Sequence, residues 1–379
     1  MNVFRIPPLS LTLSLLLPVL SACASQPGAS TVQAAPAAKP VIIVDDAPLP
    51  PPAPDTSTIR LLERAEVQDF IDNLVASQGF QRAELEAFFN SVRLNDNAIQ
   101  LMRPAPPGQP RNWQTYRARF IEPTRINAGL QFWSTHAAAL EKAEAAYGVP
   151  AEIIVGIIGV ETLYGRYTGR YRVPDVLTTL AFAYPDTPNR NVRMEYFRRE
   201  VANVLLLSRE RRIDPFTLTG SYAGAIGLPQ FMPGSILAYA VDFDGNGQID
   251  LLNSPVDAIG SVANFLKHHG WQPGQPFAFP AKVSGNEQRW EHLLKQGLVA
   301  KNTLEDLRQA GVQPQEGTPP EFRYGLVDLQ NGTDPTEYWL GTPNFFAITQ
   351  YNRSYFYAMA VIDLGQAIKE QRTASTKNN

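Results

Sequence analysis

An almost unbroken apolar run is the feature that most constrains the fold of this chain. Residues 153–160 read Ile-Ile-Val-Gly-Ile-Ile-Gly-Val, and Pro150 stands shortly before them, where proline suits the start of a helix. The run is apolar on every side of the expected helix, so the helix cannot lie on a solvent-exposed surface. The sequence therefore predicts a helix buried inside the folded part of the chain.

The first candidate functional residue, Glu161, ends this run. At helical spacing it shares a face with Ile157 and Ile158, so its carboxyl is expected at the edge of an apolar environment. Desolvation raises the pKa of a carboxyl, and a carboxyl that holds a proton near neutral pH can act as a general acid. The alternative is structural: Glu161 ends the helix and turns to solvent, or pairs with Arg166.

The composition and periodicity predict a mainly α (α+β) fold. Of the 379 residues 44% are hydrophobic, enough to bury a substantial core, and the net charge of -3 does not suit a nucleic-acid partner. Residues 271–342 are broken by Pro, Gly and Asn and predict a small subdomain with strands over 277–283 and 321–327. Apolar residues at spacings of three and four predict helices over 61–74, 130–143, 151–163, 192–211, 235–241, 255–267 and 354–371.

The N-terminus predicts export and lipidation. Residues 9–20 are largely apolar but too few to span a bilayer, which is typical of a signal peptide, here residues 1–22. Cys23 ends a Leu-Ser-Ala-Cys stretch that resembles a bacterial lipobox. It is the single cysteine of the chain, so it is either a lipid anchor or an incidental free thiol. Residues 23–56 are rich in Ala and Pro, which favours an extended tether.

A glycine-rich segment, residues 220–233 (GSYAGAIGLPQFMP), is the second candidate site. Its glycines permit tight turns and close approach of a ligand, but they match no phosphate-binding motif. Ser221 and Gln230 are its hydrogen-bonding candidates, and Phe231 and Met232 are its candidate apolar walls. The alternative is a glycine-rich connection between two helices.

The third candidate site is a metal loop. Residues 242–250 (DFDGNGQID) match the first nine positions of an EF-hand, with side-chain oxygens from Asp242, Asp244 and Asn246 and the carbonyl of Gln248. The usual glutamate at position 12 is missing, and Asp257 could supply that carboxylate. The oxygen-only ligand set favours a structural Ca²⁺, and no organic cofactor is expected. The alternative is a hairpin rich in turn residues.

Three stretches together resemble the membrane-bound lytic murein transglycosylase B family: residues 149–162 (VPAEIIVGIIGVET), the glycine-rich segment, and residues 256–264 (VDAIGSVAN). The resemblance implies a lysozyme-like helical catalytic core with an extra helical region and a small β-containing subdomain. It implies cleavage of the β-1,4 bond between N-acetylmuramic acid and N-acetylglucosamine of peptidoglycan, with formation of 1,6-anhydromuramic ends. A non-catalytic peptidoglycan-binding lipoprotein is the alternative.

The resemblance also implies residue roles. Glu161 matches the single catalytic acid/base, Asp257 matches a calcium ligand, and Phe265 stands where a tyrosine is expected. Residues that match the substrate-binding groove are Ser221, Gln230, Tyr351, Asn352, Tyr357 and Tyr116. The implied organisation is a signal peptide (1–22), a lipidated tether (23–56), an N-terminal helical region (57–145), the catalytic core with the EF-hand-like loop (146–270), the strand-containing subdomain (271–345) and a C-terminal segment of groove residues and helix (346–372).

The implied location is the outer membrane, facing the periplasm, because Ala24 rather than aspartate follows the lipidated cysteine. The expected partners are peptidoglycan glycan strands and the outer membrane, the latter through the lipid anchor. Proteins of cell-wall synthesis are further candidate partners.

Overall fold

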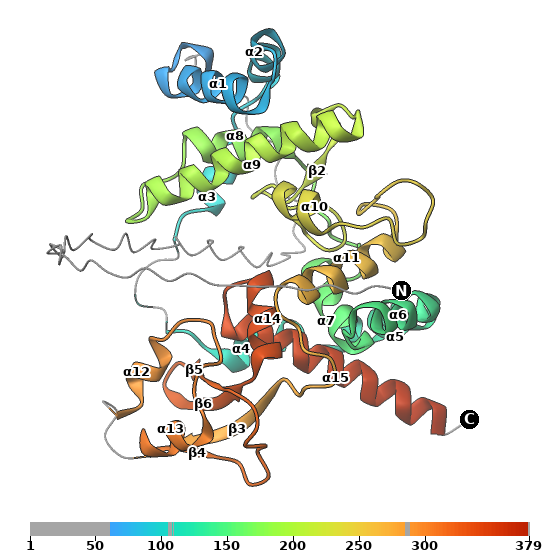
Figure 1. The fold of residues 1–379 in the computed structure, drawn as a ribbon, viewed down its shortest axis with the longest axis vertical. Coiled ribbons are helices and arrows are strands. Elements are labelled where there is room, and N and C mark those ends of the chain that lie inside the picture. Colours follow the sequence, from blue (N-terminus) through green and yellow to red (C-terminus); the bar gives the residue numbers. More distant parts are fainter. Residues whose placement is uncertain (1–60, 105–107, 109, 285–288, 378–379) are drawn as a thin grey trace, which may run out of the picture. The chain divides into compact units, whose positions relative to one another are not determined.

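The computed structural model describes residues 61–377, with gaps at 105–107, 109 and 285–288 (Figure 1). The predicted signal peptide, the tether and Cys23 lie outside the described residues. All described residues fall within a single compact unit. The fold is mostly helical with small antiparallel sheets, as predicted.

The N-terminal part is helical throughout. Its elements are η1 (Leu61–Glu63), α1 (Ala65–Gln78), α2 (Arg82–Ser91), α3 (Asp96–Leu101), α4 (Trp113–Ala118), α5 (Pro123–Thr135) and α6 (Ala137–Tyr147). The periodic stretch 130–143, predicted as one helix, is divided between α5 and α6. The division falls at His136, whose backbone leaves the helical conformation (φ -114°, ψ 26°).

The central part contains the predicted buried helix. Its elements are α7 (Ala151–Thr162), β1 (Tyr171–Arg172), α8 (Val173–Phe182), α9 (Arg190–Arg211), η2 (Pro215–Thr217), β2 (Thr219–Gly220), α10 (Pro233–Tyr239) and α11 (Pro255–His268). Every residue of α7 is buried, which confirms the prediction from its apolar run. Strands β1 and β2 form a two-stranded antiparallel sheet.

The C-terminal part holds the predicted strands. Its elements are β3 (Ala278–Val283), α12 (Glu291–Leu294), α13 (Leu304–Gln309), β4 (Val312–Pro314), β5 (Gly325–Asn331), β6 (Asp334–Gly341), α14 (Pro343–Tyr351) and α15 (Tyr355–Lys377). The sheet is antiparallel in the order β4-β3-β6-β5. The strand predicted over 321–327 instead begins at Gly325 and continues to Asn331, where it pairs with β6.

Two hydrophobic clusters organise the described residues. The larger one includes α7, α11, α14 and the buried face of α15, and the smaller one lies between the four-stranded sheet and α12 and α13. Helix α15 packs along α7 and also contacts α5, while α9 packs on α8 and α10 (Figure 1). No single described helix is both long and apolar enough to cross a membrane; α6 and α7 reach the threshold only as a pair, and a bend of 115° separates them.

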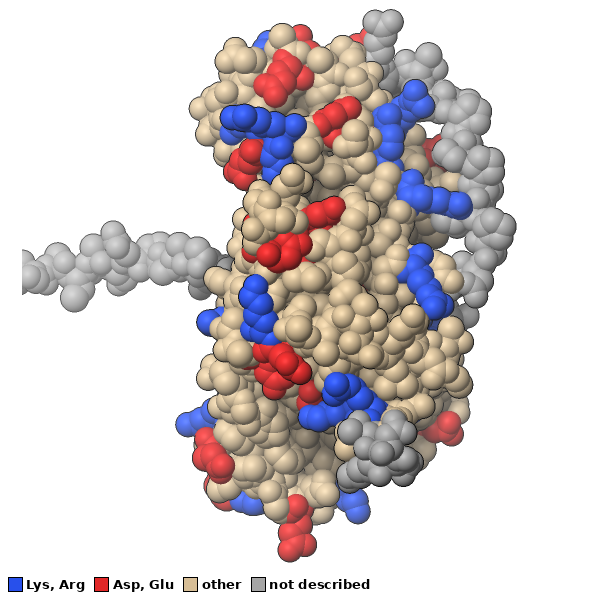
Figure 2. Space-filling model, turned by 90° about the vertical axis from the view of Figure 1, so that its right-hand side faces the viewer, with Lys and Arg blue, Asp and Glu red and all other residues tan. Residues whose placement is uncertain are grey.

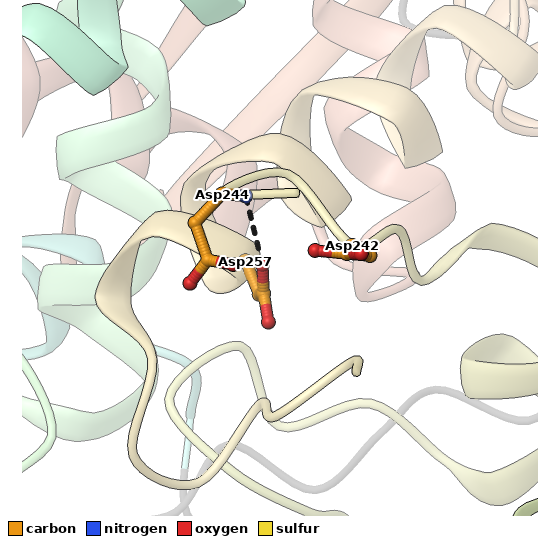
Figure 3. Close-up of side chains that lie close together, drawn as sticks. All are labelled: Asp242, Asp244 and Asp257. Atoms are coloured by element: carbon orange, nitrogen blue, oxygen red, sulfur yellow. Dashed lines mark hydrogen bonds between the residues drawn. The ribbon is translucent and has the colours of Figure 1, made fainter. Parts of the chain in front are cut away.

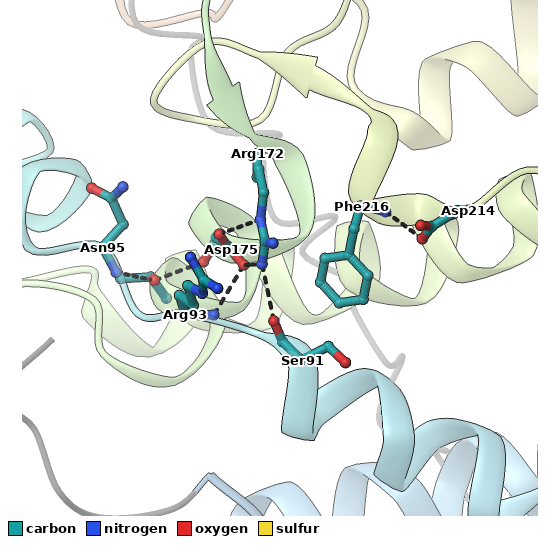
Figure 4. Close-up of polar contacts among 8 residues, drawn as sticks. Ser91, Arg93, Asn95, Arg172, Asp175, Asp214 and Phe216 are labelled. Carbon is teal, nitrogen blue, oxygen red and sulfur yellow. Dashed lines mark hydrogen bonds and ion pairs between the residues drawn. The ribbon is translucent and has the colours of Figure 1, made fainter. Parts of the chain in front are cut away.

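A buried aspartate ties the N-terminal helices to α8 (Figure 4). The Asp175 carboxylate accepts hydrogen bonds from Nε and Nη2 of Arg172, both at 2.8 Å, and from the backbone N–H of Arg93 at 3.0 Å. Arg172 also donates to the carbonyl oxygen of Ser91 at 2.9 Å. The chain that leaves α2 is thereby held against the start of α8.

The charged residues do not form a continuous surface of one sign in the view of Figure 2. Lys and Arg side chains lie among Asp and Glu side chains over most of that face, with uncharged surface between them. This distribution accords with the near balance of 33 basic and 36 acidic residues in the chain.

Glycines allow α7 and α15 to approach closely. A Cβ atom on Gly156 would lie 2.4 Å from the carbonyl oxygen of Val361, and a Cβ atom on Gly365 would lie 2.2 Å from the carbonyl oxygen of Glu152. Both distances are too short for a real carbon atom, and both partners are backbone atoms that cannot rotate away. The two helices therefore pack backbone against backbone.

We expect Gly156→Ala to destabilise the protein. Overpacking of a tight core costs about 1–3 kcal/mol, whereas the same change in an open helix adds about 1 kcal/mol of stability. Urea unfolding followed by circular dichroism measures the difference. An unfolding midpoint equal to or above that of the wild type would contradict the close backbone packing.

Candidate active site

The carboxyl of Glu161 lies at the end of α7 in a largely closed environment. Glu161 is only 8% exposed, which does not fit the branch of the structural alternative in which it turns to solvent. The hydroxyl of Tyr357, on α15, donates a hydrogen bond to Oε1 of Glu161 at 2.6 Å. Two predicted site residues that are 196 positions apart in the chain therefore meet directly.

Two buried tyrosines surround this carboxyl. The rings of Tyr351 and Tyr357 stack with centroids 6.2 Å apart and an angle of 13° between their planes. Burial, and secondarily the charge of Glu161, raises the pKa of both hydroxyls well above the usual value for tyrosine. Both phenols therefore stay protonated at neutral pH, and the hydroxyl of Tyr357 remains available as a donor to Glu161.

The glycine-rich segment packs against the end of α7. The hydroxyl of Thr162 donates to the carbonyl of Leu228 at 3.0 Å, and the hydroxyl of Tyr351 donates to the carbonyl of Pro229. Gln230, at a positive φ of 49°, donates from Nε2 to the carbonyls of Thr168 and Gly227, at 3.0 and 2.9 Å. The segment is therefore more than a connection between helices, because it is hydrogen-bonded to the elements that hold Glu161.

Several predicted contact residues lie beneath the site in the hydrophobic core. Phe231 is completely buried, Met232 is 4% exposed and Phe265 is 3% exposed. The ring of Phe265 packs against those of Phe231 and Tyr351, with centroids 5.6 and 4.9 Å away. Phe231 and Met232 were predicted as apolar walls of the site, and in the structure both pack in the hydrophobic core together with Phe265 of α11. In this structure they support the groups above them.

The remaining predicted residues are distributed around the same region. The hydroxyl oxygen of Ser221 accepts a hydrogen bond from the backbone N–H of Ala225 at 3.0 Å, and Ser221 is buried. Asn352 is buried at the end of α14. Tyr116, on α4, is half-buried, and burial and the charge of Glu161 raise its pKa. Its ring packs on that of Phe356, the neighbour of Tyr357 in the chain, with centroids 5.5 Å apart. The structure thus gathers residues from α4, α7, α14, α15 and the glycine-rich segment.

Two residues at the site were not predicted from the sequence. Thr162 anchors the glycine-rich segment, and its place directly after Glu161 was the only available signal. Arg125, on α5, donates from Nη1 to the carbonyl of Gly159 at 2.5 Å, near the end of α7. No sequence pattern connects Arg125 with α7, because the contact depends on how α5 and α7 pack.

The predicted metal loop brings its carboxylates together. Oxygen atoms of Asp242, Asp244 and Asp257 lie within 4.8 Å of one another, and Asp257 is fully buried beside the backbone of Asp244 (Figure 3). Asp257 accepts hydrogen bonds from the N–H groups of Phe243 at 2.8 Å, Asp244 at 3.3 Å and Asp250 at 2.9 Å. The described loop contains no strand, so it is not the alternative hairpin.

Hydrogen bonds within the loop hold its side chains in place. The carboxylate of Asp242 accepts from the N–H groups of Gly245, Asn246 and Gly247, and these bonds lower its pKa, the bond from Gly247 most strongly. The side-chain oxygen of Asn246 accepts from the N–H of Gln248 at 2.8 Å. The donor set contains only oxygen atoms, which is the chemistry that Ca²⁺ prefers.

The described site thus combines a buried carboxyl at the end of α7 with two tyrosines and a glycine-rich segment. Residues 63–366 match the Transglycosylase SLT domain family. The chain is 44% identical over 309 residues to membrane-bound lytic murein transglycosylase B of Escherichia coli (strain K12), covering 79% of this chain and 82% of that protein. The chain therefore belongs to the membrane-bound lytic murein transglycosylase B family, and it is a lytic transglycosylase of peptidoglycan.

Solved structures support the fold assignment. The SLT35 lytic transglycosylase of Escherichia coli in complex with calcium is 41% identical, with a TM-score of 0.70 over 83% of this chain and 95% of that chain. SltB3 of Pseudomonas aeruginosa in complex with NAG-anhNAM-pentapeptide is 29% identical, with a TM-score of 0.65 over 80% of this chain and 79% of that chain. The lysozyme-like core predicted from the sequence is confirmed, and the non-catalytic alternative is not supported.

Proposed function

We propose that this enzyme cleaves the β-1,4 bond between N-acetylmuramic acid and N-acetylglucosamine and leaves a 1,6-anhydromuramic end, with Glu161 as its single acid/base. The observation that carries the proposal is the placement of Glu161. Its carboxyl is almost enclosed, receives a hydrogen bond from Tyr357, and ends the helix whose sequence motif matches the family. A carboxyl held in this way keeps one orientation toward a bound glycan.

The proposed reaction uses one carboxyl twice. Protonated Glu161 donates its proton to the glycosidic oxygen as the bond between that oxygen and C1 of the muramoyl residue breaks. The C6 hydroxyl of the same residue then bonds to C1, and the Glu161 carboxylate takes the proton that the hydroxyl loses. Ordinary glycosidases need a second carboxylate to direct water or to attack C1. An internal hydroxyl has an effective concentration of roughly 10⁵ M or more, so it outcompetes water.

The residues around Glu161 have supporting roles in this proposal. The hydroxyl of Tyr357 fixes the position of Oε1, and Tyr351 holds the glycine-rich segment through the carbonyl of Pro229. The substrate contacts implied by the family motifs are Ser221, Gln230, Tyr351, Asn352, Tyr357, Tyr116 and Phe265, and the glycine-rich segment adds Phe231 and Met232 as candidate apolar walls. Burial of Phe231, Met232 and Phe265 favours a packing role over direct contact for these three.

We expect Glu161→Gln to lower the release of 1,6-anhydromuropeptides by roughly 10²–10⁴-fold, because the amide keeps the shape but cannot transfer a proton. Mass spectrometry of products from purified sacculi measures the loss. Co-sedimentation with sacculi should be retained. Glu141→Gln, an exposed change on α6, is the matched control and should remain fully active. Substantial residual activity of Glu161→Gln would exclude this residue as the acid/base.

We also propose a structural Ca²⁺ in the metal loop, held by Asp242, Asp244, Asn246, Gln248 and Asp257. A hard cation suits the three close carboxylates, and SLT35 was solved in complex with calcium. The ion would connect the loop after α10 with the start of α11, because Asp257 lies in the first turn of α11. Its proposed role is to stabilise the fold.

Calcium is expected to raise the melting temperature, and Asp244→Asn should abolish most of that rise. At 100 times the dissociation constant, a ligand stabilises the folded state by about 2.7 kcal/mol. Asparagine can still hydrogen-bond to the N–H of Asn246 and the hydroxyl of Ser254, as the exposed Asp244 does, but it carries no charge. With chelator present, the variant and the wild type should therefore have the same melting temperature. Thermal unfolding with calcium or with chelator tests this, with the exposed Asp186→Asn as control. If the wild type has the same melting temperature with calcium and with chelator, the site is ruled out.

The anchor is a further proposal, carried by the lipobox-like sequence before Cys23 and by the membrane-bound relative. A lipid anchor positions the enzyme at the outer membrane, facing the periplasm, and takes no part in the chemistry. Cys23→Ser should therefore fractionate away from washed outer membranes and keep its activity in solution. If the variant still sediments with washed outer membranes, Cys23 is not the anchor.

A further inference from the structure

The two faces of the four-stranded sheet have different surroundings. Paired residues of neighbouring antiparallel strands point to the same face, and successive residues alternate between faces. Tyr338 pairs with Ala281, and its ring packs on that of Trp290 with centroids 5.2 Å apart, so this face lies against the cluster that includes α12 and α13. Trp339 pairs with Pro280 and therefore points to the opposite face.

The opposite face is covered over β5 and open over β3. Val327, which pairs with Trp339, is fully buried in the larger hydrophobic cluster, and β5 contacts α4 and α15. On β3, Pro280 and Lys282 are exposed. Between these strands, Trp339 and Glu337 of β6 are half-buried. The boundary between the covered and the open part of this face therefore runs along β6.

A hollow of about 440 Å³ lies over the open part. Its lining residues include Pro280, Lys282, Glu337 and Trp339, and it is termed here the sheet hollow. This size falls within the range of about 300–1,000 Å³ that is typical of ligand sites. Neither Glu161 nor the tyrosines around it line the sheet hollow, so it is distinct from the candidate active site.

The sheet hollow presents polar groups that a ligand can bind. Among the described residues, neither the indole N–H of Trp339 nor the ammonium group of Lys282 has a hydrogen-bond or ion-pair partner. Gln114, on α4, donates from Nε2 to Oε1 of Glu337 at 2.5 Å, and Asn331 donates to the same oxygen at 3.3 Å. Both bonds end on Oε1, which leaves Oε2 as an acceptor.

An aromatic ring with donors and an acceptor beside it suits a sugar ring. A pyranose has a face of C–H groups that packs on an aromatic side chain, and its rim of hydroxyl and N-acetyl groups needs donors and acceptors. Lys282 and Glu337 are the charged residues that line the sheet hollow, and their charges cancel. The sheet hollow therefore favours a neutral ligand over a carboxylate or a phosphate.

We propose that the sheet hollow is a second glycan-binding site, which holds the glycan strand of peptidoglycan outside the active site. The enzyme is a lytic transglycosylase of peptidoglycan, so its substrate is a polymer with a neutral sugar backbone that matches the neutral hollow. The hollow is also connected to the groove through α4, because Gln114 binds Glu337 and Tyr116, two residues later, matches the groove. A strand held at two places dissociates more slowly than one held at a single place. The proposal does not depend on the role of Glu161.

The test compares kcat/KM on long soluble glycan strands with kcat/KM on a tetrasaccharide, which we expect to fill the groove alone. Both substrates carry the same peptides, so peptide recognition cancels in the ratio of the two values, the length preference. Trp339→Ala should lower the length preference roughly fivefold to tenfold, because one aromatic contact contributes about that factor. Trp339→Phe keeps an aromatic ring and should retain most of the preference.

Two lysine variants complete the comparison. Lys282→Met removes the ammonium donor but keeps the length of the side chain, and it should lower the length preference roughly threefold. Lys295→Met, an exposed change on α12 outside the sheet hollow, is the matched control and should keep the wild-type preference. A variant that merely disturbs folding lowers both kcat/KM values alike. If Trp339→Ala keeps the wild-type length preference, the proposal is wrong, and if that variant does not fold, Lys282→Met decides in the same way.

NMR of the indole N–H groups identifies the occupant directly. The chain has five tryptophans, and the signal missing from Trp339→Phe is that of Trp339. Chitotetraose, a peptide-free chain of β-1,4-linked N-acetylglucosamine, should shift this signal in the wild type and in Glu161→Gln. The proposal is overturned if chitotetraose leaves the signal in place while free wall peptides shift it. It is also overturned if the signal shifts with protein concentration alone, because the sheet hollow would then bind a second copy of the chain.

Discussion

The close contact between α7 and α15 is the constraint on which the site depends. Gly156 and Gly365 let the two backbones touch, so neither helix can slide or rotate past the other without a clash. This fixed register places the hydroxyl of Tyr357 2.6 Å from the carboxyl of Glu161. A larger residue at either glycine would separate the helices and lengthen that hydrogen bond. Packing deep in the core thus determines geometry at the carboxyl.

The same packing explains the electrostatics around Glu161. Glu161 ends an apolar helix that is buried on all sides, and two of the groups near it are phenols with strongly raised pKa values. A neutral phenol orients the carboxyl without adding a charge that would hold it permanently ionised, as a nearby arginine would. Arg125, near this end of α7, donates to the carbonyl of Gly159. A carboxyl that must give and then take a proton needs this kind of environment.

Local sequence pattern predicted the elements far better than it predicted their contacts. The apolar run before Glu161 identified α7, because a buried helix needs no tertiary partner to be recognised. The division at His136 was missed, since apolar spacing continues across a break of a single residue. Strand β6 was missed because it begins with polar residues and acquires its structure by pairing with β5 and β3. The inward packing of Phe231 and Phe265 was hidden for a similar reason: it depends on turns of the glycine-rich segment that bring distant rings together.

The positions of charged residues in the fold are likewise not predictable from local sequence, because they depend on tertiary contacts. A net charge of -3 gives no indication of where basic residues gather, because Arg353 lies more than two hundred positions after Arg111 and Arg119 and joins them only in the fold. The protein as a whole therefore does not attract an anionic cell wall over long range, and its binding to the wall must come from local contacts.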